Sequence, residues 1–191
     1  MPDQLTRGAP FLCIASTGCN SGEVADFRSE WWPVSDRNGG RHQIGIPGRL
    51  RVGIPGRIES ESARYDGTVF PAARPSFLRR WIRQPQGVAF GVYAKERLQG
   101  YGVLRACRRG FKIGPLFADD SHIADTLFQG LASRVPGQPI FLDTPEANPA
   151  AIKLAKRHGM EPVFETARMY TKGLPPGQID RCFGVTTFEL G

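Results

Sequence analysis

Hydrophobic and polar positions follow regular periods only in the last two thirds of the chain. Residues 76–84, SFLRRWIRQ, place large apolar side chains at helical spacing with arginines on the other face, and Pro85 ends this pattern. Three apolar runs follow at 88–94, 98–107 and 111–117, with short turns between them. The pattern therefore predicts one amphipathic helix ahead of three strands in an antiparallel meander.

The elements that follow alternate between helix and strand. Apolar residues recur at helical spacing over 124–135, and the continuous apolar run at 139–143 is typical of a buried parallel strand. A second amphipathic helix is predicted over 148–159, and two further strands at 163–170 and 182–190. This order predicts an α+β (α/β) fold, with a mixed, mostly antiparallel sheet and helices on both of its faces.

The beginning of the chain has a different character. Residues 1–63 show no sustained period of 3.6 or 2, and they contain a tandem repeat, IGIPGRLR at 44–51 followed by VGIPGRIE at 52–59. Two copies are too few to bury a solenoid core, and Pro and Gly at fixed offsets disfavour helix and interrupt strand pairing. The prediction is a poorly ordered extension over 1–63 and one folded domain over 64–191.

Composition and charge narrow the function classes. The 191 residues include 25 Lys and Arg against 18 Asp and Glu, a net charge of +7, and residues 74–112 hold ten basic side chains and one acid. A basic segment attracts nucleic acid without sequence preference, but no stacking platform or recognition motif accompanies this one, so nucleic acid is not a favoured partner. No apolar run is long enough for a membrane span, which predicts a cytoplasmic protein without a membrane partner.

The four cysteines and three histidines show no metal-ligand spacing. Cys13, Cys19, Cys107 and Cys182 are far apart in the sequence, without a Cys-x-x-Cys pair. Reduced thiols and no bound metal are therefore expected.

A family resemblance adds to this pattern. The segment NPAAIKLAKRHGMEPV, residues 148–163, is similar to the motif of GCN5-related N-acetyltransferases (GNAT) in which Asn opens the fourth helix and Gly precedes the next strand. Over residues 65–190 the chain resembles the C-terminal domain of a tandem subgroup of this superfamily. The resemblance implies a GNAT acyl-CoA N-acyltransferase-like fold. It also implies transfer of an acetyl group from acetyl-CoA to an amine of a small molecule or peptide.

The resemblance also implies where acetyl-CoA would bind. In this fold the third and fourth strands splay to admit the pantetheine arm, and amides at the start of the following helix hold the pyrophosphate. Gly114 and Pro115 predict such a bulge or splay in the third strand. The implied cofactor-binding residues are Ile113, Gly114, Leu116, His122, Ile123, Ala124 and Asn148.

Two positions depart from the family pattern. Where the family has a basic or amide residue opening a glycine-rich loop, this chain has Asp119 and Asp120, and His122 occupies a glycine position. Carboxylates repel a diphosphate, so Asp119 and Asp120 are predicted to cap the helix instead. Ala155 stands where many members have a tyrosine that protonates the leaving thiolate, which a methyl group cannot do.

Candidates for proton transfer are few. Glu146, in the loop before the fourth helix, and Glu165, on the following strand, are candidate bases, and each could equally be a solvated surface acid. Tyr170 is a candidate acid, with Tyr101 as a second, although an inward tyrosine on a strand is more often part of the core.

Two functions therefore stay open alongside the disfavoured nucleic-acid binding. The first is an N-acetyltransferase that uses acetyl-CoA. The second is a non-catalytic acetyltransferase-like domain that binds a small ligand or packs against a separate cofactor-binding domain. Exposed apolar surface left by a missing partner domain also makes a homodimer plausible.

Overall fold

The computed structural model describes residues 6–16, 49–52, 57–94, 96–171, 173 and 177–188. They form a single eight-stranded sheet, mixed but mostly antiparallel, which confirms the predicted fold class. The strands are β1 (Thr6–Ser16), β2 (Arg49–Val52), β3 (Gly87–Ala94), β4 (Arg97–Ala106), β5 (Phe111–Ala118), β6 (Ile140–Pro145), β7 (Glu161–Tyr170) and β8 (Cys182–Gly184). The helices are α1 (Arg57–Val69), α2 (Pro75–Ile82), α3 (Ser121–Ala132), α4 (Pro149–Arg157) and the 3₁₀ turn η1 (Ile179–Arg181).

The sheet has the strand order β2-β3-β4-β5-β6-β1-β7, and β8 pairs with β5 outside this path. The predicted meander is confirmed, because β3 pairs antiparallel with β4 and β4 with β5. β5 and β6 form the parallel pair that the helix between them requires. All other strand pairs are antiparallel.

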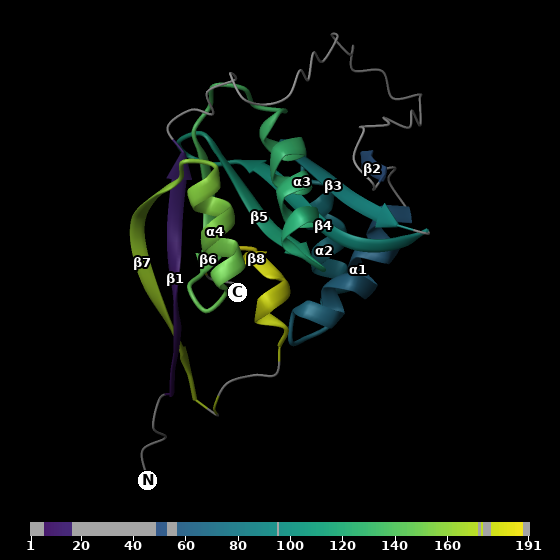
Figure 1. Cartoon of the computed structure of the whole chain (residues 1–191). Coiled ribbons are helices and arrows are strands. Elements are labelled where there is room, and N and C mark those ends of the chain that lie inside the picture. The colour runs from purple at the N-terminus through teal and green to yellow at the C-terminus, as the bar shows by residue number, and fades with distance from the viewer. Residues whose placement is uncertain are drawn as a thin grey trace.

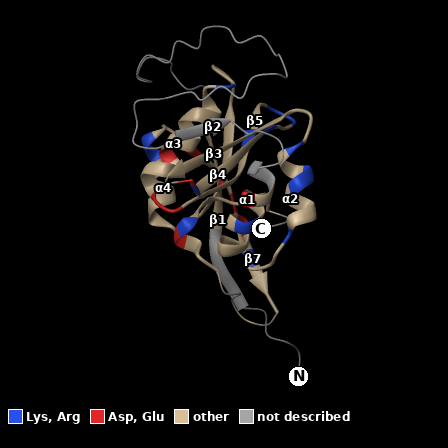
Figure 2. Cartoon of the chain, turned by 90° about the vertical axis from the view of Figure 1, so that its right-hand side faces the viewer, with Lys and Arg blue, Asp and Glu red and all other residues tan. Residues whose placement is uncertain are grey.

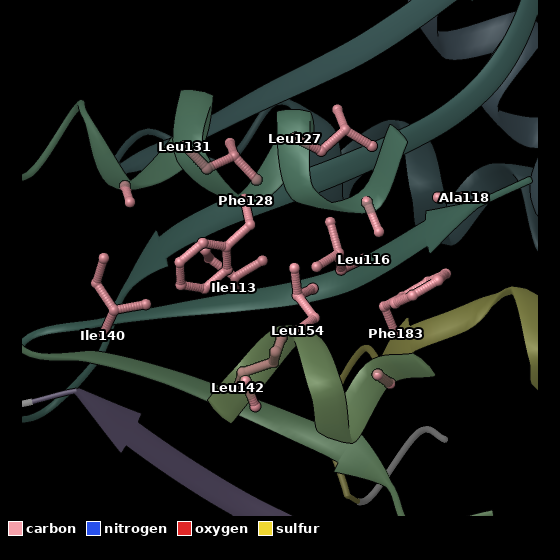
Figure 3. Close-up of a cluster of buried hydrophobic side chains, with 14 of the residues drawn as sticks. Ile113, Leu116, Ala118, Leu127, Phe128, Leu131, Ile140, Leu142, Leu154 and Phe183 are labelled. Carbon is pink, nitrogen blue, oxygen red and sulfur yellow. The ribbon is translucent and has the colours of Figure 1, made fainter. Parts of the chain in front are cut away.

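Helices cover both faces of the sheet (Figure 1). α3 and α4 lie on one face, where Leu127, Phe128 and Leu131 of α3 and Leu154 of α4 contribute to a buried apolar cluster (Figure 3). α1 and α2 lie on the other face, and their side chains join a second cluster that includes the fully buried Tyr101. The sheet is therefore the middle of three layers, as an amphipathic helix on each face demands.

Local sequence explains where α3 and α4 begin. The Asp120 carboxylate accepts hydrogen bonds from the backbone N–H groups of His122 (2.8 Å) and Ile123 (2.9 Å) at the start of α3. Asn148 caps α4 in the same way, and Pro149 occupies the first turn, where its missing N–H costs nothing. The capping role predicted for Asp120 is thus confirmed.

Residues 6–16 differ from the sequence-based prediction. The pattern assigns them to a poorly ordered extension, but they form β1 between β6 and β7, and Phe11, Cys13 and Ile14 are buried. The reason is non-local pairing, because both neighbours of β1 come from residues 140–170 and no turn in the nearby sequence signals them. Part of the repeat also pairs, since β2 lies beside β3.

The predicted domain boundary at residue 63 falls inside a helix. α1 begins at Arg57, within the second repeat copy, and ends at Val69. Residues 17–48 of the predicted extension lie outside the described residues. At the other end, the strand predicted over 182–190 is shorter than expected, because only Cys182–Gly184 is paired as a strand.

Other expectations concern membranes, metals and thiols. None of the described helices is long and apolar enough to cross a membrane. Within the described parts of the chain no group of His, Cys, Asp or Glu residues could hold a metal ion. Cys13, Cys107 and Cys182 are free thiols, and Cys19 lies outside the described residues.

Candidate functional site

The cleft that the fold offers lies between β5 and β6. These parallel strands pair only from Phe111 to Ile113 and then diverge. The predicted bulge is present, since the β4–β5 register shifts by one residue around Gly114 and Pro115. Beyond this point the edge of β5 that faces β6 is open to another backbone.

The chain itself occupies this opening. Residues 177–188, here called the C-terminal segment, bring β8 to the edge of β5, where Gly184 pairs with Leu116. On the β6 side, the Val185 N–H donates to the Asp143 carbonyl oxygen at 2.9 Å. Figure 1 shows β8 between these two strands. Leu116 and Phe117 of β5 and Asp143 of β6 therefore have backbone partners within the chain.

Packing in the cleft is close on both sides of the segment. A Cβ atom at Gly114 would lie 2.5 Å from the Val185 oxygen and 2.7 Å from the Thr186 oxygen, so only glycine fits there. A Cβ at Gly184 would collide with the Leu142 side chain. Phe183, 1% exposed, enters the apolar cluster beneath α3 and α4 (Figure 3). The segment is thus part of the core.

Asn148 connects this segment to α4. Its side-chain oxygen accepts from the backbone N–H groups of Ala150 and Ala151, at 3.0 and 3.3 Å. Its side-chain nitrogen donates to the carbonyl oxygens of Ile179 (3.1 Å) and Cys182 (2.9 Å), with Asp180 as a third acceptor. The amide therefore caps the helix and binds the C-terminal segment.

The N-terminus of α3 is also engaged within the chain. The Asp120 carboxylate accepts hydrogen bonds from two backbone N–H groups in the first turn of α3. A carboxylate therefore already occupies the position where the helix favours an anion. Asp119 does not cap the helix as predicted. Its carboxylate forms an ion pair with Arg181 of the C-terminal segment and accepts a hydrogen bond from the Tyr65 hydroxyl at 2.8 Å.

Electrostatics stabilise this arrangement. The Arg181 guanidinium lies 4.8 Å from the centre of the Tyr65 ring and beside the Asp119 carboxylate. Burial raises the pKa of Tyr65, and hydrogen bonding to Asp119 acts in the same direction. Burial alone would lower the pKa of Arg181, but Tyr65 and Asp119 raise it above its ordinary value. Arg181 therefore stays charged and Tyr65 stays neutral at physiological pH.

In the arrangement that the structure shows, the residues of the cleft do not fit acyl-CoA. A pantetheine arm needs the free edge of β5, which β8 occupies, and a pyrophosphate needs the N–H groups that Asp120 occupies. Among the residues implied as cofactor-binding, Ile113, Leu116 and Ala124 are fully buried in the core. Gly114 contacts the C-terminal segment, and Ile123 and Asn148 are also buried. His122 is exposed at the start of α3.

The predicted catalytic residues lie in the turn after β6 and on β7. Glu146 is exposed in the turn after β6, and Glu165 is exposed on β7. Tyr170 is half-buried at the end of β7, where the Arg168 guanidinium lies 5.4 Å from its ring centre. Among the described residues no hydrogen bond connects these three side chains, and their catalytic role stays a prediction. Tyr101 is fully buried in the core.

The structure contains a buried polar network that was not predicted from the sequence. Asp66, 0% exposed, accepts two hydrogen bonds from Arg74 (2.8 and 2.9 Å) and one from the Tyr101 hydroxyl (2.5 Å). Arg74 also donates to the Thr186 hydroxyl at 2.9 Å, so the network reaches the C-terminal segment. Burial raises the pKa of Tyr101 well above its usual value, and the Asp66 charge adds to this effect. An acid and an arginine eight residues apart carry no recognisable local signal.

A buried ion pair also joins the neighbouring strands β5 and β6. Lys112 of β5 forms an ion pair with the fully buried Asp143 of β6. Burial raises the pKa of Asp143, an effect that Lys112 opposes. Burial, together with the Asp143 charge and a hydrogen bond, also raises the pKa of Cys13 to about 12. The Cys13 thiol is therefore inert at neutral pH.

The basic segment of residues 74–112 is not one continuous surface. Arg74 and Lys112 form internal ion pairs, and the Arg105 guanidinium lies 5.2 Å from the Trp81 ring centre. Arg79 and Arg80 are exposed on α2, where basic residues are visible in Figure 2. Some basic side chains of this segment therefore interact with other residues of the fold.

Comparison with known proteins identifies the family. Residues 63–184 match the family model described as an acetyltransferase (GNAT) domain. This chain belongs to the GNAT acetyltransferase domain family. Proteins with this fold generally use acyl-CoA.

This GNAT domain spans about half the length of each relative that it matches. It is 26% identical over 150 residues to the holothin acyltransferase of Pseudoalteromonas sp., a match that covers 78% of this chain and 51% of that protein. The crystal structure of a proposed acetyltransferase from Pyrococcus horikoshii is 18% identical, with a TM-score of 0.64, and covers 98% of this chain and 53% of the other. A GCN5-related N-acetyltransferase from Sphaerobacter thermophilus is 16% identical (TM-score 0.53), covering 85% and 51%. The two solved structures support the fold assignment.

Proposed function

We propose that this chain acts in acyl transfer as a non-catalytic GNAT domain that packs against a separate acyl-CoA-binding domain of the same family. The observation that carries the proposal is the C-terminal segment in the cleft between β5 and β6, where Val185 bonds to β6 and Gly184 pairs with β5. The chain covers only about half of the length of the relatives that it matches, which leaves room in them for a second domain.

In this proposal the acyl donor is acetyl-CoA and the acceptor is an amine of a small molecule or peptide. Both would bind to the partner domain, while this chain supplies structural support. The tandem arrangement and the cytoplasmic location are parts of the same proposal. The likeness to an acyltransferase over 78% of this chain supports the reaction class.

Calorimetric titration of the full chain with acetyl-CoA tests the first half of the proposal. The expected result is no saturable binding up to millimolar acetyl-CoA, in a sample whose cooperative thermal unfolding shows that it is folded. Saturable binding at micromolar concentration would overturn the proposal, because the cleft would then have to accept the pantetheine arm.

A chimera tests the second half. This chain would replace the matched half of the holothin acyltransferase, which leaves the other half of that protein in place. The expected stoichiometry is one acetyl-CoA per chimeric chain, bound by the other half. Two molecules per chain would contradict a non-catalytic role, and a chimera whose two parts fail to pack would contradict the partner role.

The second candidate is catalysis by this chain itself, as an N-acetyltransferase. The family match over residues 63–184 favours it. It requires the C-terminal segment to leave the cleft and expose the edge of β5. Release of CoA from acetyl-CoA in the presence of an amine, reduced by E146Q or E165Q, would support this candidate against the first.

A further inference from the structure

β7 is a long edge strand with exposed apolar side chains. It pairs with β1 on one side, and among the described residues no strand pairs with its other side. Val163, Phe164 and Met169, all on β7, are 55%, 50% and 47% exposed, and they make up three of the four exposed large hydrophobic residues of the described chain. An edge of this kind is a template for pairing with another strand.

We propose that β7 pairs antiparallel with β7 of a second copy of this chain, with the two-fold axis at Ala167. The two sheets then form one continuous sheet across an isologous interface. This inference concerns the outer edge of β7 and does not depend on whether the cleft between β5 and β6 binds acyl-CoA.

The position of the axis follows from the regular part of the edge. The pairing of β7 with β1 contains a bulge at Val163, because Cys13 pairs with Phe164 and the next residue, Ile14, pairs with Pro162. This bulge interrupts the regular edge of β7, whereas a second register shift, between Arg7 and Pro10, has its extra residue on β1. The usable edge of β7 therefore runs from Phe164 to Tyr170. Two antiparallel copies use all of this edge only when its central residue, Ala167, faces itself.

This register also gives compatible side-chain pairs. Phe164 of each copy faces Tyr170 of the other, and aromatic pairs across strands are stabilising. Thr166 faces Arg168, and Glu165 faces Met169, so no like charges oppose one another directly. Ala167 has the smallest side chain of the strand and lies at the axis, where the two backbones approach each other.

Alternative registers are less favourable. Residues opposed across a two-fold axis must share a face of the sheet, so the axis passes through one residue position. An axis at Glu165 would oppose two carboxylates, and an axis at Arg168 would oppose two guanidinium groups. An axis at Thr166 would draw the bulged Val163 into the pairing. A second copy therefore fits this edge best in one register.

Disulfide trapping tests the register on the full chain. The A167C variant is expected to form a disulfide-linked dimer under mild oxidation, because residue 167 faces its own counterpart within disulfide reach. T166C is the matched control, since residue 166 faces Arg168 and its thiol is displaced from its counterpart. Cross-linking of T166C in preference to A167C, or of neither above the parent protein, would overturn the proposed register.

A charge substitution at one exposed position tests the pairing without cysteines. Light scattering during gel filtration should give a mass near twice the 21.0 kDa of one chain. M169K places a lysine opposite Glu165 of the other copy and should leave the dimer at least as tight. M169E places a glutamate opposite Glu165 of the other copy, and the two-fold axis repeats this repulsion at a second place. M169E should therefore raise the dimer dissociation constant by about tenfold or more relative to M169K.

A control outside β7 separates pairing from general loss of apolar surface. Ile179, 42% exposed in the C-terminal segment, is the fourth exposed large hydrophobic residue among those that the structure describes, and I179E should leave the dimer unchanged. Equal effects of M169K and M169E, or a parent protein that is monomeric at about 100 µM, would overturn the proposal. Loss of the dimer in I179E but not in M169E would place the interface elsewhere.

Discussion

The Val185 N–H donates to the carbonyl oxygen of Asp143 at 2.9 Å, which joins the C-terminal segment to β6 at the position where the two parallel strands have parted. With β8 paired to β5 on the other side, the C-terminal segment occupies the edges of both strands where a ligand backbone would pair. This contact is the main support for the proposal that this GNAT domain is non-catalytic.

Gly114 provides a direct test of the filled cleft. A Cβ at this position would lie 2.5 Å from a backbone oxygen of the C-terminal segment, and backbone cannot rotate away as a side chain can. G114A should therefore lower the free energy of unfolding by about 2–3 kcal/mol, as overpacking does. Denaturant unfolding of the variant and parent measures the difference.

The matched control for this substitution is G67A. Gly67 lies in α1, and a Cβ there would meet nothing within 4 Å. Alanine favours helix over glycine, so G67A should stabilise the chain by about 0.5–1 kcal/mol. If G114A were as harmless as G67A, the C-terminal segment would not be seated against β5.

Alkylation of Cys182 reports on the same segment in the native state. Burial raises the pKa of this thiol to about 12, and the residue is 6% exposed. At pH 8 only about one molecule in 10⁴ would carry the thiolate, so iodoacetamide should not label Cys182 in the folded chain. Cys107, which is half-buried in the turn between β4 and β5, should be labelled much faster.

Mass spectrometry of digested peptides gives the labelling of each cysteine. Guanidinium chloride should expose Cys182 and make its labelling rate equal to that of Cys107. Rapid labelling of Cys182 without denaturant would show that the C-terminal segment leaves the cleft readily, which would favour the catalytic candidate.

The sequence predicts those elements whose signals are local. The α3 and α4 helices follow from apolar spacing and from capping by Asp120 and Asn148, and the meander follows from short turns between apolar runs. β1 and the β8 pairing were not predictable in this way. Their partners lie far away in the sequence, so their stabilising contacts exist only after the sheet has assembled.

In the candidate site, too, the features with local sequence signals were predictable and those that depend on distant residues were not. The acidic residues at the start of α3 already indicated that a diphosphate is disfavoured there, and the cap formed by Asp120 has this effect. The pairing of Asp119 with Arg181 could not be inferred, since 62 residues separate them. The sequence also indicated that Asn148 caps α4, but not that its amide nitrogen binds backbone of the C-terminal segment.

The network around Asp66 should dominate the stability of the α1 and α2 layer. D66N leaves the Arg74 guanidinium, 11% exposed, without its buried countercharge. Removing one partner of a buried ion pair costs about 3–5 kcal/mol, so D66N should unfold at much lower denaturant concentration than the parent.

Y101F is the matched control, because it removes one hydroxyl and leaves the Asp66–Arg74 pair intact. Its expected cost is about 1 kcal/mol. Comparable losses in D66N and Y101F, measured by the same denaturant titration, would mean that the ion pair contributes little and that only the hydroxyl contact matters.

The contact between Asp125 and His158 predicts a pH dependence of stability. His158 Nε2 lies 2.6 Å from the Asp125 carboxylate, and Arg157 lies 3.2 Å from its other oxygen. Burial would raise the pKa of Asp125, but His158 and then Arg157 lower it below its usual 3.8. A carboxyl group with a lowered pKa stabilises the fold above its unfolded pKa, and this stabilisation is lost as pH falls through the folded value.

D125N should therefore be less stable than the parent by about 2 kcal/mol at pH 7. The gap should begin to narrow as pH falls below 3.8 and should close below the lowered pKa, where both chains carry a neutral group at this position. Thermal unfolding of both chains between pH 2 and 7 measures it. R157A, which removes an exposed partner, should cost much less. A gap between parent and D125N that stays constant down to pH 2 would show that the aspartate acts through packing and not through its charge.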